Sequence, residues 1–216
     1  MTTATISASP LTPNLEFSHP VSAEQVEATA EALRANGMET IIVPDGAAAR
    51  ELVLSMLPEG AEVFTAGSRT LDTIGLAAAI NESGNYQAIR PQIMGLDRAT
   101  QGREMRKLGA SPDYVVGSVH AITSQGQVLI ASYGGSQLAS YVYGASKVIW
   151  VVGTQKLVSS LDEGMRRIHE YSLPLEDARL RATMGRPSHV AKILQVNEEA
   201  IPNRVTVVLV QEALGF

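Results

Sequence analysis

"LIASYGGSQLASYVYGASKVIWVVGTQK", residues 129–156, contains the unit from which the fold can be predicted. Apolar runs predict buried strands over 127–132 and 147–153. Between them a glycine-serine loop at 134–136 leads into a segment of small residues, for which we expect a helix over 136–143. Strands that alternate with helices are typical of a mainly parallel sheet with helices on both faces.

The same alternation extends over most of the chain. Apolar runs predict further strands over 40–44, 61–66 and 114–123, and two at the end, over 189–196 and within 204–216. Helices are predicted over 22–37, after Asp45, over 70–80 and 97–109, and from Ser160. The predicted fold class is α/β, a mainly parallel sheet with helices on both faces, to which the last two strands add a small C-terminal β appendage.

The domain organisation follows from length and composition. Residues 1–20 are rich in Thr, Ser and Pro, and we expect them to be a flexible N-terminal lead. They contain neither the basic region nor the apolar region of a signal peptide, so we expect a cytoplasmic protein. Residues 21–216 are long enough for one sizeable core, which predicts a single α/β domain.

Composition excludes several classes of function. The chain has no cysteine, which removes disulfides, thiolate metal sites and thiolate-bound iron–sulfur clusters. The net charge of −5 and the lack of a basic cluster argue against nucleic acid as the partner. No apolar run reaches the length of a membrane span. The four histidines lack metal-ligand spacing, so no metal site is predicted.

Two loops share one arrangement that suits an anion. Gly67-Ser68 follows the strand over 61–66, and Gly134-Gly135-Ser136 follows the strand over 127–132. Where a strand leads through glycine into a helix, free backbone N–H groups can bind an anion, and ligands settle at the carboxyl ends of strands in such sheets. Each loop alone is equally well explained as an ordinary turn with a helix cap.

Two side chains could add chemistry to these loops. Lys156 follows the strand over 147–153 and could supply a charge to a phosphate or carboxylate, although an exposed loop lysine is the simpler alternative. His120, which we expect inside an apolar strand, is a weak candidate for an acid or base. A hydrogen-bonded structural histidine is the alternative.

A longer series of motifs resembles the LUD family of lactate utilisation proteins, LutC/YkgG type. It runs from "GSRTLDTIGL" (67–76) through "DYVVGSVHAITSQG" (113–126) and "VVGTQK" (151–156) to "RIHEYSLPLEDARL" (167–180). This family is related in fold to ribose-5-phosphate isomerases and coenzyme A transferases. The order and spacing of the LUD family's motifs are retained over about residues 40–181 of this chain.

The resemblance implies a function and a set of binding residues. It implies a role in the oxidation of L-lactate to pyruvate alongside iron–sulfur partner subunits, with no cofactor held by this chain. Together with the loops, it predicts a site for a small anion whose residues are Gly67, Ser68, Arg69, Thr70, Gly134, Gly135, Ser136, Gln137, Gln155 and Lys156.

The chain departs from the family pattern at several positions. Ser136-Gln137 replaces Asn-Arg, which removes a guanidinium, and Gln155 replaces Asn. Residues 117–120 read Gly-Ser-Val-His where the isomerases have their catalytic Asp-Gly-Ala-Asp. A stand-alone enzyme acting on a sugar phosphate or an acyl-coenzyme A substrate, and a non-catalytic assembly or regulatory subunit, therefore remain alternatives. Homo-oligomerisation and the role of residues 171–189 are left open.

Overall fold

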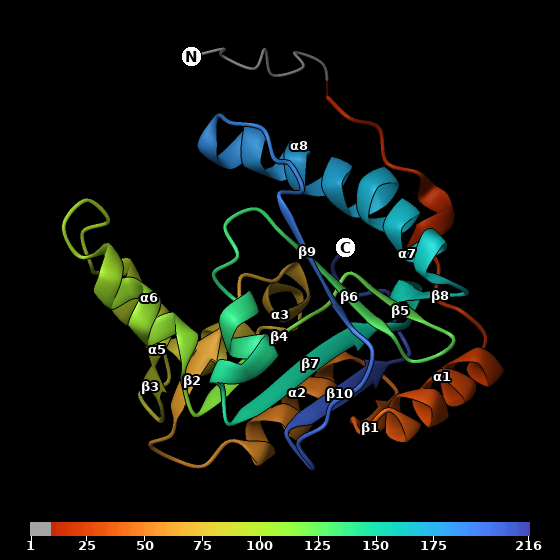
Figure 1. Ribbon diagram of the computed structural model, residues 1–216, viewed down its shortest axis with the longest axis horizontal. Coiled ribbons are helices and arrows are strands. Elements are labelled where there is room, and N and C mark those ends of the chain that lie inside the picture. Colours follow the sequence, from red (N-terminus) through yellow and green to blue (C-terminus); the bar gives the residue numbers. More distant parts are fainter. Residues whose placement is uncertain (1–9) are drawn as a thin grey trace.

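Six parallel strands form the large sheet of the protein, in the order β1-β10-β7-β4-β2-β3. The computed structural model describes residues 10–216 (Figure 1). The strands of this sheet are β1 (Glu39–Val43), β2 (Glu62–Thr65), β3 (Gln87–Ala88), β4 (Tyr114–Gly117), β7 (Lys147–Gly153) and β10 (Val205–Val210). The mainly parallel α/β fold predicted from the sequence is confirmed.

A smaller mixed sheet lies beside the large one, in the order β8-β5-β6-β9. It consists of β5 (Ala121–Thr123), β6 (Val128–Ser132), β8 (Leu157–Val158) and β9 (Lys192–Val196). Strand β6 runs antiparallel to both β5 and β9, and β5 runs parallel to β8. The chain passes from the large sheet into the small one twice, after β4 and after β7.

Helices cover both faces of the large sheet because its central strands are apolar on both sides. Val148, Trp150 and Val152 of β7 pack in one cluster with α1 (Ala23–Ala35), whereas Ile149 and Val151 pack in another with α2 (Gly46–Met56). The second cluster also includes α3 (Arg69–Thr73) and α4 (Leu76–Asn81). Successive side chains of β7 thus point to opposite faces of the sheet, and this one strand packs against the helix layers on both faces.

The remaining helices lie at the edge of the large sheet and over the small sheet. Helices α5 (Ile89–Met94) and α6 (Gly102–Ala110) lie side by side near β2 and β3 (Figure 1). Helices α7 (Leu161–Arg167) and α8 (Leu173–Met184) continue into each other through a π-helical turn, Ile168–Ser172. Leu161 and Met165 of α7 pack on the small sheet.

Several local predictions were accurate. Ser22 caps α1 in a capping box with Gln25, Asp45 caps α2, and Ser160 caps α7. The first nine residues of the predicted N-terminal lead lie outside the described residues. Beyond them, Leu15–Ser18 form a 3-10 turn in which Phe17 is buried.

The prediction of one strand over 114–123 was wrong. The structure has two strands there, β4 and β5, in different sheets, and Ser118 to His120 cross between them. Strands β4 and β5 are both apolar and buried, so the hydrophobic pattern of 114–123 does not show where the chain leaves one sheet and enters the other. His120 therefore lies in a crossing loop and not in a strand.

The two C-terminal strands do not pair with each other. Strand β9 joins the small sheet beside β6, whereas β10 lies inside the large sheet between β1 and β7, second from the edge. All six residues of β10 are buried, as a central parallel strand requires. The appendage thus corresponds to the small mixed sheet, and a C-terminal hairpin does not form.

Helices differed from the predictions in three places. The helix over 70–80 is divided at Gly75, which has a φ of 68°. The helix over 136–143 begins after a turn at 136–137, with one short α-helical stretch at 138–139, and is π-helical over Ser140–Gly144. Helix α5 was missed because its short sequence, "IRPQIM", carries an internal proline and no helical period.

Candidate functional site

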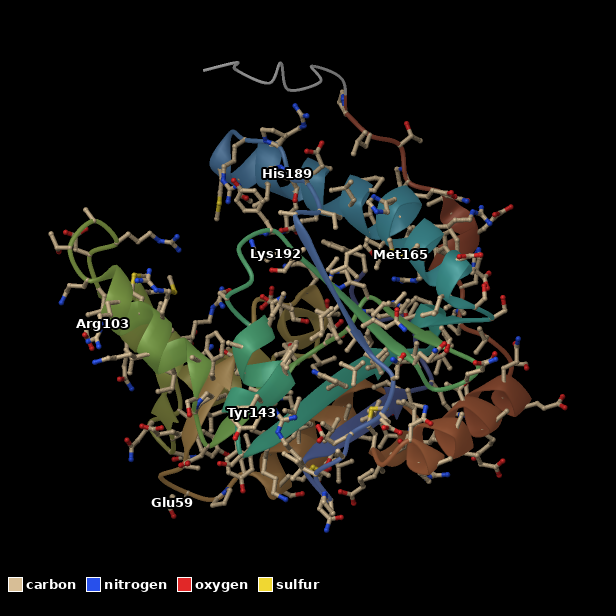
Figure 2. All side chains as sticks on the ribbon, viewed as in Figure 1. Glu59, Arg103, Tyr143, Met165, His189 and Lys192 are labelled. Carbon is tan, nitrogen blue, oxygen red and sulfur yellow. The ribbon has the colours of Figure 1, made fainter. Side chains whose placement is uncertain are left out.

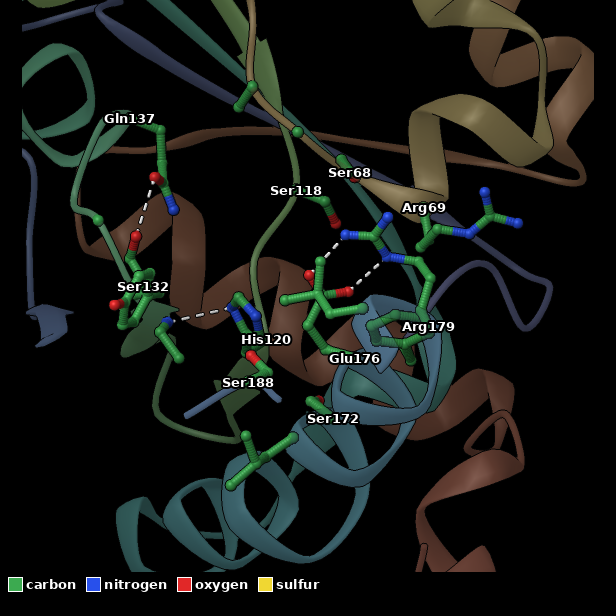
Figure 3. Close-up of a pocket in the computed structure, with 18 of the residues that line it drawn as sticks. Ser68, Arg69, Ser118, His120, Ser132, Gln137, Ser172, Glu176, Arg179 and Ser188 are labelled. Atoms are coloured by element: carbon green, nitrogen blue, oxygen red, sulfur yellow. Dashed lines mark hydrogen bonds and ion pairs between the residues drawn. The ribbon is translucent and has the colours of Figure 1, made fainter. Parts of the chain in front are cut away.

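A cavity of about 430 Å³ opens at the carboxyl edge of the large sheet. The segments that follow β2, β4 and β7 all end at this edge because the strands are parallel. The end of β6 and the segment 168–190, which includes α8, close the other sides (Figure 3). The cavity therefore lies between the two sheets and α8.

The structure brings the two glycine-serine loops to this one cavity. Eight of the predicted residues line it, namely Gly67, Ser68, Arg69, His120, Gly134, Ser136, Gln137 and Lys156. These residues come from four separate segments of the chain. The convergence fits the expected placement of the loops, while their role in binding stays a prediction.

Three predicted residues lie behind the cavity wall and hold it in place. The Thr70 hydroxyl donates to the Leu214 carbonyl oxygen at 3.1 Å. The buried Gln155 amide donates to the carbonyl oxygens of Leu214 and Gly215 at 3.0 and 3.2 Å. The Gly135 N–H donates to Ser132 Oγ at 2.9 Å, so this amide already has an internal acceptor.

The second loop is shaped by Ser132 and Gln137. The Ser132 hydroxyl donates to Gln137 Oε1 at 3.2 Å (Figure 3). Lys192 donates to the carbonyl oxygen of Tyr133, and the Tyr133 and His189 rings meet edge-on with their centroids 4.5 Å apart. His189 and Lys192 lie where the chain leads from α8 into β9 (Figure 2). The side chains around this loop therefore fix its position against the start of β9.

Helix dipoles contribute little to the first loop. Helix α3 has only five residues, and Ser68 makes no side-chain cap hydrogen bond. The absence of a side chain at Gly67 instead leaves room for Arg90, whose guanidinium nitrogen lies 3.4 Å from where a Cβ would stand. Arg90 also donates to the Thr65 carbonyl oxygen at 3.2 Å.

The cavity wall is basic although the whole chain is acidic, with a net charge of −5. Arg69 pairs with Asp72 at 3.3 Å, and Arg179 pairs with Glu176 at 2.7 Å (Figure 3). Within residues 10–216, no carboxylate forms an ion pair with the other basic residues of the wall. The lining thus has two acidic side chains, Asp72 and Glu176, against five basic ones, Arg69, Arg90, Lys156, Arg179 and Arg186.

Lys156 is the most deeply buried of these basic residues, with 1% of its surface exposed. Its Nζ donates to Thr70 Oγ1 at 2.9 Å and to Ser118 Oγ at 3.0 Å. Burial, and secondarily the nearby Arg167 cation, hold the pKa of Lys156 well below its usual value. An ammonium group here lacks a counter-ion among the described residues.

Arg167 lies directly behind the cavity and is fully buried. It donates to the carbonyl oxygens of His120 and Gln155 and to the Ser172 hydroxyl. Its Nη2 has no hydrogen-bond partner among residues 10–216, and burial lowers the pKa of Arg167 to about 10. Helix α7 turns this side chain inward, away from solvent.

His120 is held as a neutral ring with its proton on Nε2. Its Nδ1 accepts a hydrogen bond from the Ala131 N–H at 3.1 Å (Figure 3), so the neutral tautomer carries hydrogen on Nε2. Burial, followed by the charges of Lys156 and Arg167, lowers the pKa of His120 to about 3. His120 therefore fits a hydrogen-bond donor better than a general base near neutral pH.

This histidine should make the protein less stable in acid. Because its pKa falls from 6.5 to about 3 on folding, only the unfolded chain takes up this proton between those values. The stabilisation is complete above pH 6.5 and is lost as the pH falls towards 3. We expect the free energy of unfolding, measured with urea from pH 4 to 7, to rise with pH less steeply in His120→Gln than in the wild type. The difference in slope should reach up to about 1.4 kcal/mol per pH unit. Equal slopes would contradict this protonation state.

Several lining residues were not singled out in the sequence. Arg90 lies in α5, which was itself missed, and Ser118 stood in a motif without an assigned role. Arg179 and Glu176 lie on α8 within the segment whose role was left open. A signal existed for Ser118 and Arg179, because both belong to motifs that carry the resemblance.

The described residues contain neither a membrane-spanning helix nor a cluster suited to a metal. In residues 10–216, no helix is long and apolar enough to cross a bilayer. The same part of the chain has no group of three His, Asp or Glu side chains placed to hold an ion.

One family model and one solved structure are similar to this chain. The family model described as LUD domain matches residues 26–210. A crystal structure of a DUF162 family protein from Deinococcus radiodurans is similar in fold, with a TM-score of 0.55 and 15% sequence identity. The match covers 88% of this chain and 99% of that one. No curated protein matches the sequence.

Proposed function

The chain belongs to the LUD domain family, and from this premise we propose that its cavity binds a small anion during lactate utilisation. The proposed context is the cytoplasmic oxidation of L-lactate to pyruvate together with iron–sulfur partner subunits. Lactate and pyruvate are both carboxylates at neutral pH, so the first question is whether the cavity suits a carboxylate.

The observation that carries the proposal is the excess of basic side chains in the cavity wall. Burying a charge without a partner is costly, and a bound anion would offset that cost for Lys156, which is almost completely buried. Arg90 is half-buried in the same wall and would add a second positive charge. Arg90 lies beside Gly67, and Lys156 lies between the segments after β2 and β4. An anion between them would also reach the hydroxyls of Ser68 and Ser136, which line the same cavity.

The redox part of the reaction would belong to partner subunits. The chain has no cysteine, so thiolate-bound iron–sulfur clusters would be held elsewhere. His120, the one residue considered for acid–base work, fits a neutral donor that could hydrogen-bond a carboxylate or a keto oxygen. These features favour a binding role for this chain in the oxidation of lactate.

Isothermal titration calorimetry with a panel of ligands tests this proposal. The panel consists of L-lactate, pyruvate, inorganic phosphate, ribose 5-phosphate and coenzyme A, with lactamide as the uncharged analogue of lactate. We expect at least one anion to bind with a dissociation constant of about 1 mM or below, more weakly at higher salt, and lactamide to give no heat. The proposal fails if every anion is silent with folded protein or if lactamide binds as tightly as lactate.

A further inference from the structure

Ser118 and Lys156 are placed as a nucleophile and its base. Ser118 Oγ lies 3.0 Å from Lys156 Nζ, within the distance at which a proton passes directly between two groups. Both side chains line the cavity. We propose that this pair transfers an acyl group from an ester or thioester to the Ser118 hydroxyl, an activity beyond the binding of an anion.

The base is held in place by a third group. Lys156 Nζ also donates to Thr70 Oγ1 at 2.9 Å, and the Thr70 hydroxyl donates to the Leu214 carbonyl oxygen at 3.1 Å. Thr70 Oγ1 also lies 3.3 Å from Ser118 Oγ, so Thr70 contacts both members of the pair. With its one hydrogen directed to the nearer Leu214 oxygen, Thr70 presents its oxygen lone pairs to the lysine. A nucleophile, a base and a group that orients the base form the arrangement found where hydroxyls are activated.

The nucleophile is presented to the cavity by its position in the fold. Ser118 directly follows β4, at the carboxyl edge of the large sheet. Its backbone is hydrogen-bonded to the hydroxyl of Tyr141, which is almost completely buried. The Ser118 side chain is half-buried and belongs to the lining, so an acyl donor in the cavity can reach it.

The protonation state of Lys156 suits a base. Burial, together with the charge of Arg167, lowers the pKa of Lys156, which favours the neutral amine when the cavity holds no anion. A neutral amine has the lone pair that must take up the serine proton. Asp72 and Glu176, the acidic residues of the wall, are paired with Arg69 and Arg179 and do not pair with Lys156.

The reaction balances with water as the second substrate. Ser118 Oγ adds to the acyl carbon while its proton passes to Lys156 Nζ, and the bond to the leaving alcohol or thiol breaks as the ammonium returns the proton to it. Water then adds to the acyl-serine, giving one proton to Nζ. That proton returns to Ser118 Oγ as the carboxylic acid leaves.

Donors for the developing oxyanion are available in the same wall. The Nε2–H of neutral His120 and the guanidinium of Arg90 both belong to the lining. A donor fixed before the reaction stabilises the negative oxygen of the tetrahedral intermediate. The cavity volume of about 430 Å³ suits a small acyl group and not a long chain.

Acetylation by 4-nitrophenyl acetate tests the inference. The full chain is mixed with the ester in buffer free of phosphate and carboxylates, because a bound anion would favour protonated Lys156 and remove the base. We expect a burst of nitrophenolate and one acetyl group on the peptide that contains Ser118. The burst rate should level off at a pH below the usual lysine pKa.

Three variants make the result decisive. Ser118→Ala should lose the acetyl-serine, and Lys156→Met should slow the burst by about 10²- to 10⁴-fold. Ser55→Ala, the same change on the exposed side of α2, should behave as the wild type. Circular dichroism checks that each variant is folded. Acetyl on Lys156, acetyl on surface amines alone, or an unchanged burst in folded Ser118→Ala would overturn the inference.

Discussion

Gly117→Ala is expected to lower the free energy of unfolding by about 3 kcal/mol or more. A Cβ at this position would stand 1.7 Å from the Tyr141 hydroxyl oxygen, 2.9 Å from its Cζ and 3.0 Å from the Ala66 Cβ. Tyr141 is fully enclosed and packs edge-on against Trp150 at 5.5 Å. Neither neighbour can move aside without disturbing the core between β4 and β7.

Urea denaturation of Gly117→Ala measures this cost. Gly134→Ala is the matched control, because no atom lies within 4 Å of a Cβ built there and its stability should stay within about 0.5 kcal/mol of the wild type. Tyr141→Phe should partly rescue Gly117→Ala by removing the atom that lies closest. If Gly117→Ala is as stable as Gly134→Ala, the position of Tyr141 beneath Ser118 is contradicted.

The same substitution connects the core to the site. Gly117 directly precedes Ser118, whose hydroxyl lies 3.0 Å from Lys156 Nζ. A Tyr141 ring forced away from Gly117 would lose its hydrogen bond to the Ser118 backbone. The glycine therefore supports both the packing of the sheet and the placement of the serine.

The parts of the fold that follow local rules could be predicted from the sequence. The capping residues Ser22, Asp45 and Ser160 mark helix starts, and the apolar run over 147–153 coincides with β7. These signals depend on neighbours in the chain, so the sequence alone contains them. Parallel order then implies that the segments after β2 and β7 meet at one edge.

Other parts depend on contacts that sequence patterns do not show. The two strands within 114–123 are both apolar and buried, so the hydrophobic pattern does not show that the chain changes sheet between them. The inward direction of Arg167 follows from the packing of α7 on the small sheet. Arg90 reaches the cavity only because α5 lies against β2.

The burial of Lys156 was likewise beyond prediction. A lysine in a loop after a strand is usually solvated, but here the 3-10 turn Thr154–Lys156 directs the chain into the small sheet. The side chain is thereby enclosed between Thr70 and Ser118. The sequence indicates a positive charge at Lys156. Only the tertiary structure shows that this charge has no counter-ion among the described residues.

Lys156→Met is therefore expected to weaken anion binding strongly while leaving the empty protein as stable or more stable. The substitution replaces a buried amine by an apolar chain of similar length, which removes the cost of burying a polar group. When an anion binds, the wild-type amine can become an ammonium paired with it, so binding should take up a proton and weaken as the pH rises. Losing one partner of such a buried pair costs about 2 kcal/mol or more, or about 30-fold in affinity.

Lys147→Met provides the matched control. Lys147 begins β7, at the opposite end of the strand from the cavity, and its exposed amine donates to the Asn203 carbonyl oxygen. Lys147→Met makes the same substitution at an exposed amine, so a general effect of lost positive charge on the surface would weaken binding in this variant too. An effect confined to Lys156→Met would come from the cavity.

The most direct test is the calorimetric dissociation constant of the tightest-binding anion for the wild type, Lys156→Met and Lys147→Met at the same pH and salt. If the bound anion pairs with the Lys156 ammonium, the dissociation constant should increase by about 30-fold or more in Lys156→Met. It should keep its wild-type value in Lys147→Met. Equal affinities in all three proteins, with Lys156→Met folded, would contradict the cavity as the anion site.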